Sequence, residues 1–165
     1  MRRDWMTCNL HLPIPLAPVV SAMSRAILHH DAEALACLMF DAYRGTVDDG
    51  GETLEDARGE VRKLLTGEFG AFDAAHSTLW FEKETLAAAT ILTRTRGSQA
   101  DPFLAFSMTA PHAQRRGLAR AGLIRVMRQL RAAGHARLHL VVTRANVRAV
   151  SLYRSCGFVV APKPG

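Results

Sequence analysis

The sequence predicts an α/β protein with a mixed β-sheet, because helical and strand patterns alternate along a chain of ordinary globular composition. Two amphipathic helices come first, a β-hairpin follows, and the last third reads strand, helix, strand, helix, strand. The chain has 165 residues, of which 48% are hydrophobic and 22% charged. These values suit one domain with one sizeable core, so we expect a single domain over residues 1–165.

The first twenty residues are predicted to form an extended lead-in, with a first strand near residues 5–12. Two arginines precede an apolar stretch, as they do in a secretory signal. An aspartate, a histidine and three prolines interrupt that stretch, which argues against a cleaved signal. The prolines also exclude a helix interior, so we expect residues 1–20 to fold in extended form.

Two helices are predicted from apolar spacing and capping residues. The first begins at Asp31, a good N-cap, carries an apolar stripe as far as Tyr43, and stops at Gly45. Cys37 is assigned to its buried face. The second begins at Thr53, a cap residue, and ends at Gly67. An acidic turn-rich loop, residues 47–51, lies between them.

A hairpin and three further strands follow. Residues 77–81 and 85–93 alternate as two strands with a turn at 82–84, and a polar loop containing Gly97 spans 94–101. The run 103–109 suits a central strand, and 138–143 suits a buried one. A strong helix is expected over 117–133, a final helix over 146–156, and a short last strand over 158–160.

Charge is unevenly distributed along the chain. The net charge is +6, but no acidic residue follows Asp101, and the segment 102–165 contains eleven Lys and Arg residues. Such a surface attracts polyanions, although a merely solubilising role explains it equally well. Three cysteines without metal-ligand spacing fit a reducing cytoplasm, and no window is apolar enough for a membrane span.

The stretch TAPHAQRRGLA, residues 109–119, predicts a site for a pyrophosphate. It joins a strand end to a helix start, where several backbone N–H groups lack partners and the helix dipole is positive. Gly117 allows a ligand to approach the backbone closely. Arg115, Arg116 and Arg120 add charge for phosphate oxygens. Neither of the two common glycine-rich phosphate loops is present.

A second stretch, NVRAVSLYRSCGF at residues 146–158, completes a pair of motifs that resembles the GNAT superfamily of acyl-CoA N-acyltransferases. The first stretch is similar to that family's V-x-P-x-x-[QR]-x-x-G-x-[GA] motif, with Thr109 in place of the usual valine. The second matches N-x-x-A-x-x-L-Y-x-x-x-G-F at every fixed position. The resemblance covers residues 103–158 and implies a central mixed sheet flanked by helices, with splayed central strands.

The resemblance also implies roles for individual residues in an acetyl-CoA-dependent N-acetyltransferase. Tyr153 is expected to face the cofactor sulfur, where a phenol can hydrogen-bond or protonate the leaving thiolate. Acetyl-CoA is the expected co-substrate, and no metal is expected. The cofactor-binding residues implied are Ser107, Met108, Thr109, Gln114, Arg115, Arg116, Gly117, Leu118, Ala119, Arg120 and Asn146.

The acceptor and the general base are the least defined parts of the site. In this family the region after the first helix commonly borders the acceptor pocket, so Tyr43, Asp48 and Asp49 are candidate acceptor-binding residues, and Glu82 of the hairpin turn is a further candidate as an amine-steering group. Three carboxylates in the loop at 47–52 favour a cationic amine. Some branches carry a glutamate before the asparagine, where this chain has Val141. The remaining candidate bases are Glu82, Asp48, Asp49, His112 and His139, or water.

Several readings of the function stay open at this point. The acceptor is a small-molecule or peptide amine, a protein terminus, an antibiotic or an aminoacyl-tRNA, although no aromatic residues interleave the arginines as nucleic-acid binding favours. A non-catalytic acetyl-CoA-binding regulator is the alternative to an enzyme. Only seven residues follow Phe158, whereas many family members continue with another strand. We expect that strand to be absent or supplied by a second subunit in a homodimer.

Overall fold

A seven-stranded mixed sheet forms the centre of the molecule in the computed structural model, which describes residues 1–96 and 100–163. The strand order is β2-β3-β4-β5-β6-β1-β7. All neighbours are antiparallel except β5 and β6, which are parallel. The strands are β1 (Arg3–Asn9), β2 (Met23–Arg25), β3 (Thr78–Glu82), β4 (Thr85–Arg94), β5 (Pro102–Thr109), β6 (Arg137–Thr143) and β7 (Val159–Val160).

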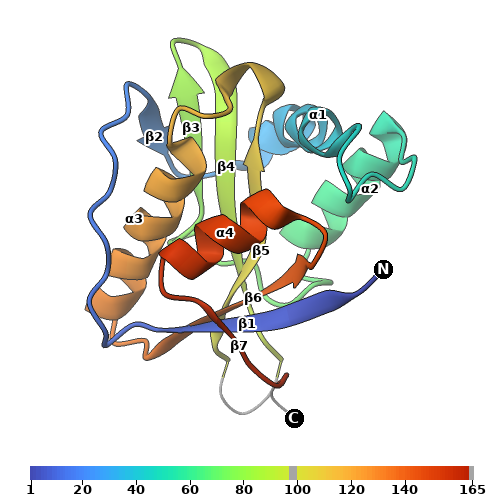
Figure 1. Ribbon diagram of the computed structural model, residues 1–165. Coiled ribbons are helices and arrows are strands. Elements are labelled where there is room, and N and C mark those ends of the chain that lie inside the picture. Colours follow the sequence, from blue (N-terminus) through green and yellow to red (C-terminus); the bar gives the residue numbers. More distant parts are fainter. Residues whose placement is uncertain (97–99, 164–165) are drawn as a thin grey trace.

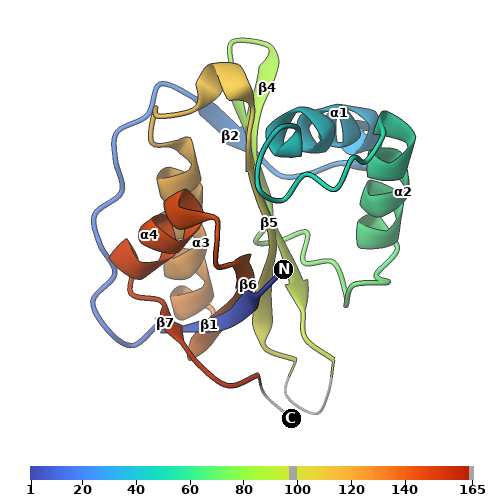
Figure 2. The ribbon, with the colours of Figure 1, turned by 45° about the vertical axis from the view of Figure 1, so that its right-hand side comes forward.

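Four α-helices cover the two faces of the sheet. Helices α1 (Ala32–Tyr43) and α2 (Leu54–Leu65) lie on one face, and α3 (Leu118–Ala132) and α4 (Val147–Ser155) lie on the other (Figure 1, Figure 2). Short 3₁₀ turns occur at His29–Asp31 and Pro111–Ala113. The buried apolar residues form two clusters, one that includes α1, α2 and the start of α3, and one that includes the rest of α3 with β1, β6 and α4. No helix in the described parts of the chain is long and apolar enough to cross a bilayer.

The helix starts follow the predicted capping chemistry. Thr53 and Asp56 form a reciprocal capping box at the start of α2. The Asn146 side chain accepts a hydrogen bond from the Ala149 amide at 3.1 Å and so caps α4. The hairpin differs slightly from prediction, because β3 continues through Glu82 and the turn contains Lys83 with φ at 57°.

The strand beside β6 comes from the N-terminus of the same chain. Strand β1 pairs with β6 along its whole length, from Arg3 opposite Thr143 to Asn9 opposite Arg137, and β7 pairs with its other edge. In the described residues no further strand follows β7, and the strand between β6 and β7 is β1 of the same chain; the expected homodimer stays a prediction. The alternation of residues 5–12 identified a strand, but alternation does not specify which strand is its neighbour.

The segment between β1 and β2 crosses the outer side of α3 as an extended strap, residues 10–22 (Figure 1). Two arginines of α3 hold it by its backbone. Arg128 donates to the Pro15 carbonyl at 3.3 Å, and Arg131 donates to the Leu12 carbonyl at 3.4 Å. The extended form predicted for the lead-in is present, and β2 at its end was not anticipated.

One core assignment was wrong. Cys37 is exposed, whereas Leu35, Leu38 and Met39 are buried. Positions two apart face in different directions on a helix, so Cys37 lies off the buried stripe. The polar loop assigned to residues 94–101 lies between β4 and β5, and its Gly97 falls outside the described residues.

Strands β5 and β6 diverge, as the sequence resemblance implied. They pair only through Phe103 with His139 and Leu104 with Leu140, near the start of β5. The register between β4 and β5 shifts in the same region, because Ile91 lies opposite Phe106 and Leu92 opposite Leu104. Ala105 is thus the extra residue of a β-bulge, which bends the strand and leaves one residue out of the ladder.

Candidate functional site

A cavity of about 870 Å³ opens where β5 and β6 diverge. Its walls come from the diverging parts of these strands, from the end of α1, from the loop between α1 and α2 with the first turns of α2, and from α4. Residues far apart in the sequence therefore share one space. The predicted site residues that line it are Tyr43, Asp48, Asp49, Ser107, Asn146 and Tyr153.

Tyr153 projects from α4 into the buried end of this cavity. Only 9% of the residue is exposed, and its ring packs 5.8 Å from the ring of Phe158. Burial raises the pKa of Tyr153 to about 12, and the charge of Asp48 adds to this effect. A hydrogen bond from Ser107 on β5 acts in the opposite direction. The phenol therefore keeps its proton at neutral pH.

Asp48 is held beside Tyr153 by the residue that caps α4. The Asn146 side chain accepts from the Ala149 amide with its oxygen and donates to Asp48 Oδ2 with its nitrogen at 2.9 Å. One asparagine thus fixes both the start of the tyrosine helix and a carboxylate of the loop after α1. The sequence resemblance associated Asn146 with the cofactor, and the structure adds this second contact.

Tyr43 completes the group at the same end of the cavity. It is the last residue of α1, and burial of its hydroxyl, with the nearby Tyr153 and Asp48, raises its pKa. Asp48 therefore lies close enough to both phenols to make the loss of their protons less favourable. Because both phenols are neutral, Asp48 supplies the negative charge of this group.

The predicted pyrophosphate turn has the free donors that an anion site requires. Among the described residues, the amides of residues 115–120 donate no backbone hydrogen bond of good geometry, whereas the Ala121 amide donates to the Gly117 carbonyl at 2.8 Å. Arg115 and Gly117 have positive φ values of 63° and 80°. Successive residues of this kind orient their N–H groups into a concave anion nest.

Gly117 has a role that the sequence did not reveal. We expected its missing side chain to admit a ligand, but a Cβ built on it lies 3.1 Å from Pro18 of the strap and 3.8 Å from Val20. The close neighbour of the glycine is therefore the protein's own N-terminal segment. The turn and the strap pack against each other at the N-terminus of α3.

Side-chain contacts join the turn to the tyrosine helix. Arg120 donates to Ser155 Oγ at 2.6 Å, and Arg148 of α4 donates to Gln114 at 3.1 Å. Arg116 is paired with Glu82. The turn itself does not line the cavity, so the two predicted parts of the site are linked through α3 and α4.

The other candidate bases lie outside this arrangement. Glu82 is absent from the cavity wall and instead pairs with Arg116. His139 is 2% exposed and uses both ring nitrogens, with Thr7 Oγ1 at 2.8 Å and Asp101 at 3.2 Å. His112 is exposed on the turn after β5. Val141 does line the cavity, and it brings no proton acceptor there.

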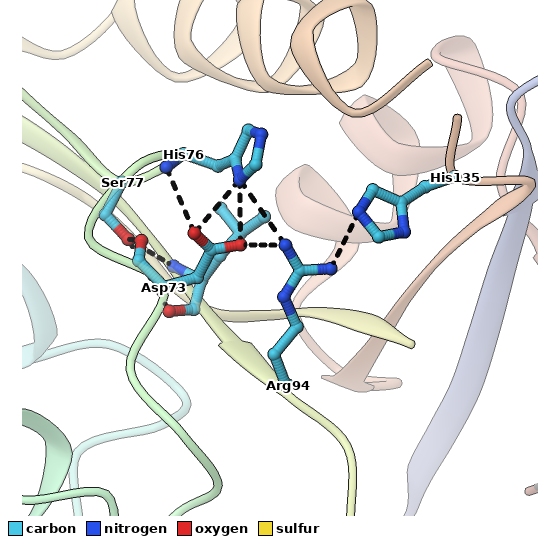
Figure 3. A network of polar contacts seen from close by, with 6 residues as sticks. Asp73, His76, Ser77, Arg94 and His135 are labelled. Atoms are coloured by element: carbon cyan, nitrogen blue, oxygen red, sulfur yellow. Dashed lines mark hydrogen bonds and ion pairs between the residues drawn. The ribbon is translucent and has the colours of Figure 1, made fainter. Parts of the chain in front are cut away.

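A separate polar cluster lies away from the cavity (Figure 3). Asp73 pairs with Arg94 at 2.6 Å and with His76 at 2.9 Å, and Arg94 donates to His135 at 3.0 Å. The presence of a serine, a histidine and an aspartate suggests a hydrolytic triad. However, Ser77 donates to the Asp73 backbone carbonyl at 2.7 Å, so the serine is not activated by the histidine. The cluster joins the start of β3 to the end of α3.

Sequence reasoning missed several residues of the cavity. Arg3 reaches it because β1 lies beside β6, and Thr93 reaches it from β4. Asp56 and Glu60 line it from α2, where their spacing of four residues was a readable signal that both face one side. In the described parts of the chain, no group of three or more His, Cys, Asp or Glu side chains is arranged to hold a metal ion.

Comparisons with known proteins agree with the motifs. The model of the acetyltransferase (GNAT) family matches residues 34–158. A comparison with curated proteins found no match. Among solved structures, a GCN5-related N-acetyltransferase from Sphaerobacter thermophilus superposes with a TM-score of 0.72 at 18% identity over 96% of this chain. This chain spans only 48% of that protein.

Two further structures share the fold at similar identity. The PaiA N-acetyltransferase from Thermoplasma acidophilum, in complex with coenzyme A, has a TM-score of 0.68 at 19% identity. The match covers 88% of this chain and 94% of that protein. The ribosomal-protein-S18-alanine N-acetyltransferase from Escherichia coli has a TM-score of 0.66 at 20% identity and covers 86% and 79%. At these identities the likeness shows the fold.

The family match spans most of the chain and includes both the turn and the tyrosine helix. The mixed sheet with diverging central strands confirms the predicted fold class. The chain therefore belongs to the acetyltransferase (GNAT) family.

Proposed function

We propose that this protein transfers the acetyl group of acetyl-CoA to a primary amine by direct attack within a ternary complex. One observation carries the proposal. The phenol of Tyr153 and the carboxylate of Asp48, fixed by Asn146, meet where β5 and β6 diverge. A proton donor for the leaving sulfur and an anion for the incoming amine are thus available in one cavity.

The turn before α3 is proposed to hold the pyrophosphate of the co-substrate. Six successive amides that donate no backbone hydrogen bond among the described residues, the positive end of a fifteen-residue helix, and the guanidiniums of Arg115 and Arg120 suit two phosphate groups. Arg116 is available only when its pair with Glu82 opens. The thioester supplies an activated acyl carbon, and residues Ser107 to Thr109 are proposed to hold its pantetheine arm through backbone hydrogen bonds.

Asp48 is proposed to bind the acceptor nitrogen. An alkylammonium has a pKa near ~10.4, so the amine arrives protonated and must lose a proton before it attacks. A carboxylate is a weak base for such a group, but it attracts the ammonium and orients it. The proton then passes through Asp48 to water at the open side of the cavity. Asn146 keeps Asp48 in place, which makes the asparagine a positioning residue.

Tyr153 is proposed to stabilise the departing sulfur as a hydrogen-bond donor. Its pKa of about 12 lies above that of a thiol, near ~8.5. Complete transfer of the phenol proton to the thiolate is therefore unfavourable, whereas a hydrogen bond that strengthens as charge develops on sulfur is favourable. The bulge at Ala105 lies next to the diverging strands, where a backbone N–H is proposed to polarise the acetyl carbonyl.

The charge of the cavity favours a cationic amine over an aminoacyl-tRNA. Five carboxylates and two guanidiniums line its wall, so a phosphate-rich acceptor is repelled there. The basic residues after position 101 are explained in part by the turn and the strap, to which Arg128 and Arg131 are bound. We therefore favour a small-molecule or peptide amine as the acceptor.

Release of free thiol from acetyl-CoA, assayed with a panel of primary amines, tests this proposal. We expect release that depends on both substrates and falls at least tenfold in the Tyr153→Phe variant at saturating concentrations. Tight binding of acetyl-CoA without thiol release for any amine would contradict the proposal and favour a regulatory protein. Turnover that is equal in the variant would remove Tyr153 from the chemistry.

A further inference from the structure

We propose that the acceptor is an elongated amine with a second ammonium group, which binds the cavity at a distance from the reacting nitrogen. This inference rests on the proposed acetyl transfer to an amine and names its substrate class. The inference rests on three observations. Among the described residues, acidic side chains are distributed along the cavity, several of them have no cationic side chain beside them, and a hydroxyl without a hydrogen-bond partner lies at the end of the cavity away from Tyr153.

The first step is the contrast between the cavity and the whole chain. The protein carries a net charge of +6, whereas the side chains that line the cavity include five carboxylates and two guanidiniums. The site is thus locally negative in a positive molecule. Charge of one sign in a concave site concentrates ligands of the opposite sign and raises their rate of arrival.

The second step is that four of these carboxylates are left for a ligand, whereas the fifth, Glu60, pairs with Lys63 at 3.0 Å. Most of the other acids in the described residues are paired with cationic or histidine side chains, as in the Arg58–Glu33 and Arg25–Asp31 pairs. Within the described residues, no cationic side chain lies within 4.0 Å of four acids of the cavity wall, Asp48, Asp49, Glu52 and Asp56. Their own hydrogen bonds go to backbone amides, to the Thr53 hydroxyl and to the neutral amide of Asn146.

The third step is the length of the acidic wall. Asp48 marks the reacting end, beside Tyr153, and the acids continue through the loop to Asp56 and Glu60 on α2. Those last two residues are one helical turn apart, a rise of about 6 Å along the axis. Helix α2 lies on one face of the sheet (Figure 2), and it lines the cavity together with the part of β5 that does not pair with β6. The negative wall therefore extends well beyond the reach of a single ammonium group.

The fourth step is a buried polar atom at the far end. Thr93 is 1% exposed, lines the cavity, and its hydroxyl has no hydrogen-bond partner among the described residues. Thr93 lies opposite Phe103 of β5. Phe103 precedes Ser107 by four residues, a separation of roughly 13 Å along the strand. An unpartnered buried hydroxyl costs free energy unless something binds it. An ammonium group can donate to such an oxygen.

Apolar side chains also line the cavity. Phe69 contributes from the loop after α2, and Phe103 and Phe106 contribute from β5. Methylene groups suit these surfaces, whereas a compact hydrophilic amine leaves them in contact with water. The combination describes an alkyl chain with a charged nitrogen at each end. A linear diamine or a longer polyamine has this structure.

The decisive experiment compares linear α,ω-diamines of increasing length with n-alkylamines of the same lengths in the thiol-release assay. We expect kcat/KM for the best diamine to exceed that of its matched alkylamine by about tenfold, a difference that decreases at high salt because the cavity is partly open. The Glu60→Gln variant, which also removes the anion paired with Lys63, should raise KM for the diamine severalfold and raise KM for the matched alkylamine by a clearly smaller factor. Equal kcat/KM values for the two series in the wild-type protein would overturn the inference.

A matched control and a binding measurement make the test independent of turnover. Glu55→Gln changes an acid of the same helix that lies outside the cavity wall and pairs with Arg58, so neither series should respond to it. Calorimetric titration of the coenzyme A-loaded protein with the same diamines measures their affinity directly. Diamine binding that weakens in Glu60→Gln supports the inference even if no amine is acetylated, a result that contradicts the proposed function alone. Absence of any preference for diamines in both measurements refutes the substrate class.

Discussion

Asn146 donates a hydrogen bond to Asp48 across 98 positions of sequence, with 2.9 Å between Nδ2 and Oδ2. The contact joins the cap of α4 to the loop between α1 and α2. Helix α4 covers one face of the sheet, and α1 and α2 cover the other (Figure 2). The contact passes through the gap where β5 and β6 diverge, so the two halves of the site meet only because the sheet is open at that point.

Replacing Asp48 with Asn should reduce kcat/KM for a cationic amine about tenfold to a hundredfold, because the ammonium loses its nearest anion. Affinity for acetyl-CoA, measured by calorimetry, should stay within about twofold. Asn146→Ala should have a similar kinetic effect and also destabilise α4 by about 1 kcal/mol through loss of the cap. The kinetic effects should be less than additive in the double variant, since both changes remove one contact. Full additivity would show that the two residues act separately.

Replacing Tyr153 with Phe should lower kcat by one to two orders of magnitude while leaving the acetyl-CoA dissociation constant nearly unchanged. The reason is that the hydroxyl acts on charge that develops only as the thiolate leaves. Steady-state kinetics combined with equilibrium binding separates the two effects. A variant that binds acetyl-CoA tenfold more weakly yet keeps its kcat would assign the hydroxyl to ground-state binding.

Replacing Gly117 with Ala should destabilise the protein by about 1–2 kcal/mol, because φ is 80° there and a Cβ would press against Pro18 at 3.1 Å. Affinity for coenzyme A should fall as well, since the turn shifts. Gly59→Ala provides the matched control, because this glycine lies inside α2 with nothing within 4 Å of a built Cβ. That change should stabilise the protein by roughly 0.5–1 kcal/mol. Urea denaturation of both variants measures the difference, and equal effects of the two changes would argue against strain at Gly117.

The free energy of unfolding should fall as pH decreases below about 6.5, with a contribution from His135. Burial and the nearby Arg94 lower the pKa of His135, whose ring accepts a hydrogen bond from that guanidinium (Figure 3). Between the lowered folded pKa and the unfolded value near ~6.5, the unfolded chain binds more protons, so stability rises with pH in this window. Below the folded pKa the contribution levels off.

Urea denaturation over a pH series, repeated with His135→Gln, checks the prediction. Glutamine retains an acceptor for Arg94 but does not titrate, so the variant should show a shallower slope in the window below pH 6.5. The same slope in both proteins would assign the acid sensitivity to other groups.

The sequence specified the elements better than it specified their neighbours. Helix limits followed from local chemistry, as at Thr53 and Asn146, where the capping side chain determines the boundary. The two motifs located the turn and Tyr153 because their function depends on residues close together in sequence. The acceptor end of the cavity has no such local basis. Asp56 and Thr93 share it only through the packing of α2 against the sheet, which no local pattern encodes.

The position of Arg3 shows the same limitation. It lines the cavity because β1 pairs with β6, and pairing partners are determined by the complete sheet rather than by alternation within one strand. Glu82 was assigned to the acceptor for its charge alone, whereas its position at the end of β3 brings it to Arg116. Charge predicted the kind of partner, and topology decided which partner it met.

The placement of β1 between β6 and β7 has a consequence for biosynthesis. Strand β1 is synthesised before residues 137–143 and 159–160, with which it pairs, so its edges stay unpaired until those residues have been made. Contacts of such high sequence separation slow folding, because the ends of a long loop must meet before any stabilising contact forms. Until then β1 and the edge of β6 that it covers are both unpaired. Unpaired strand edges favour aggregation and pairing with a neighbouring nascent chain.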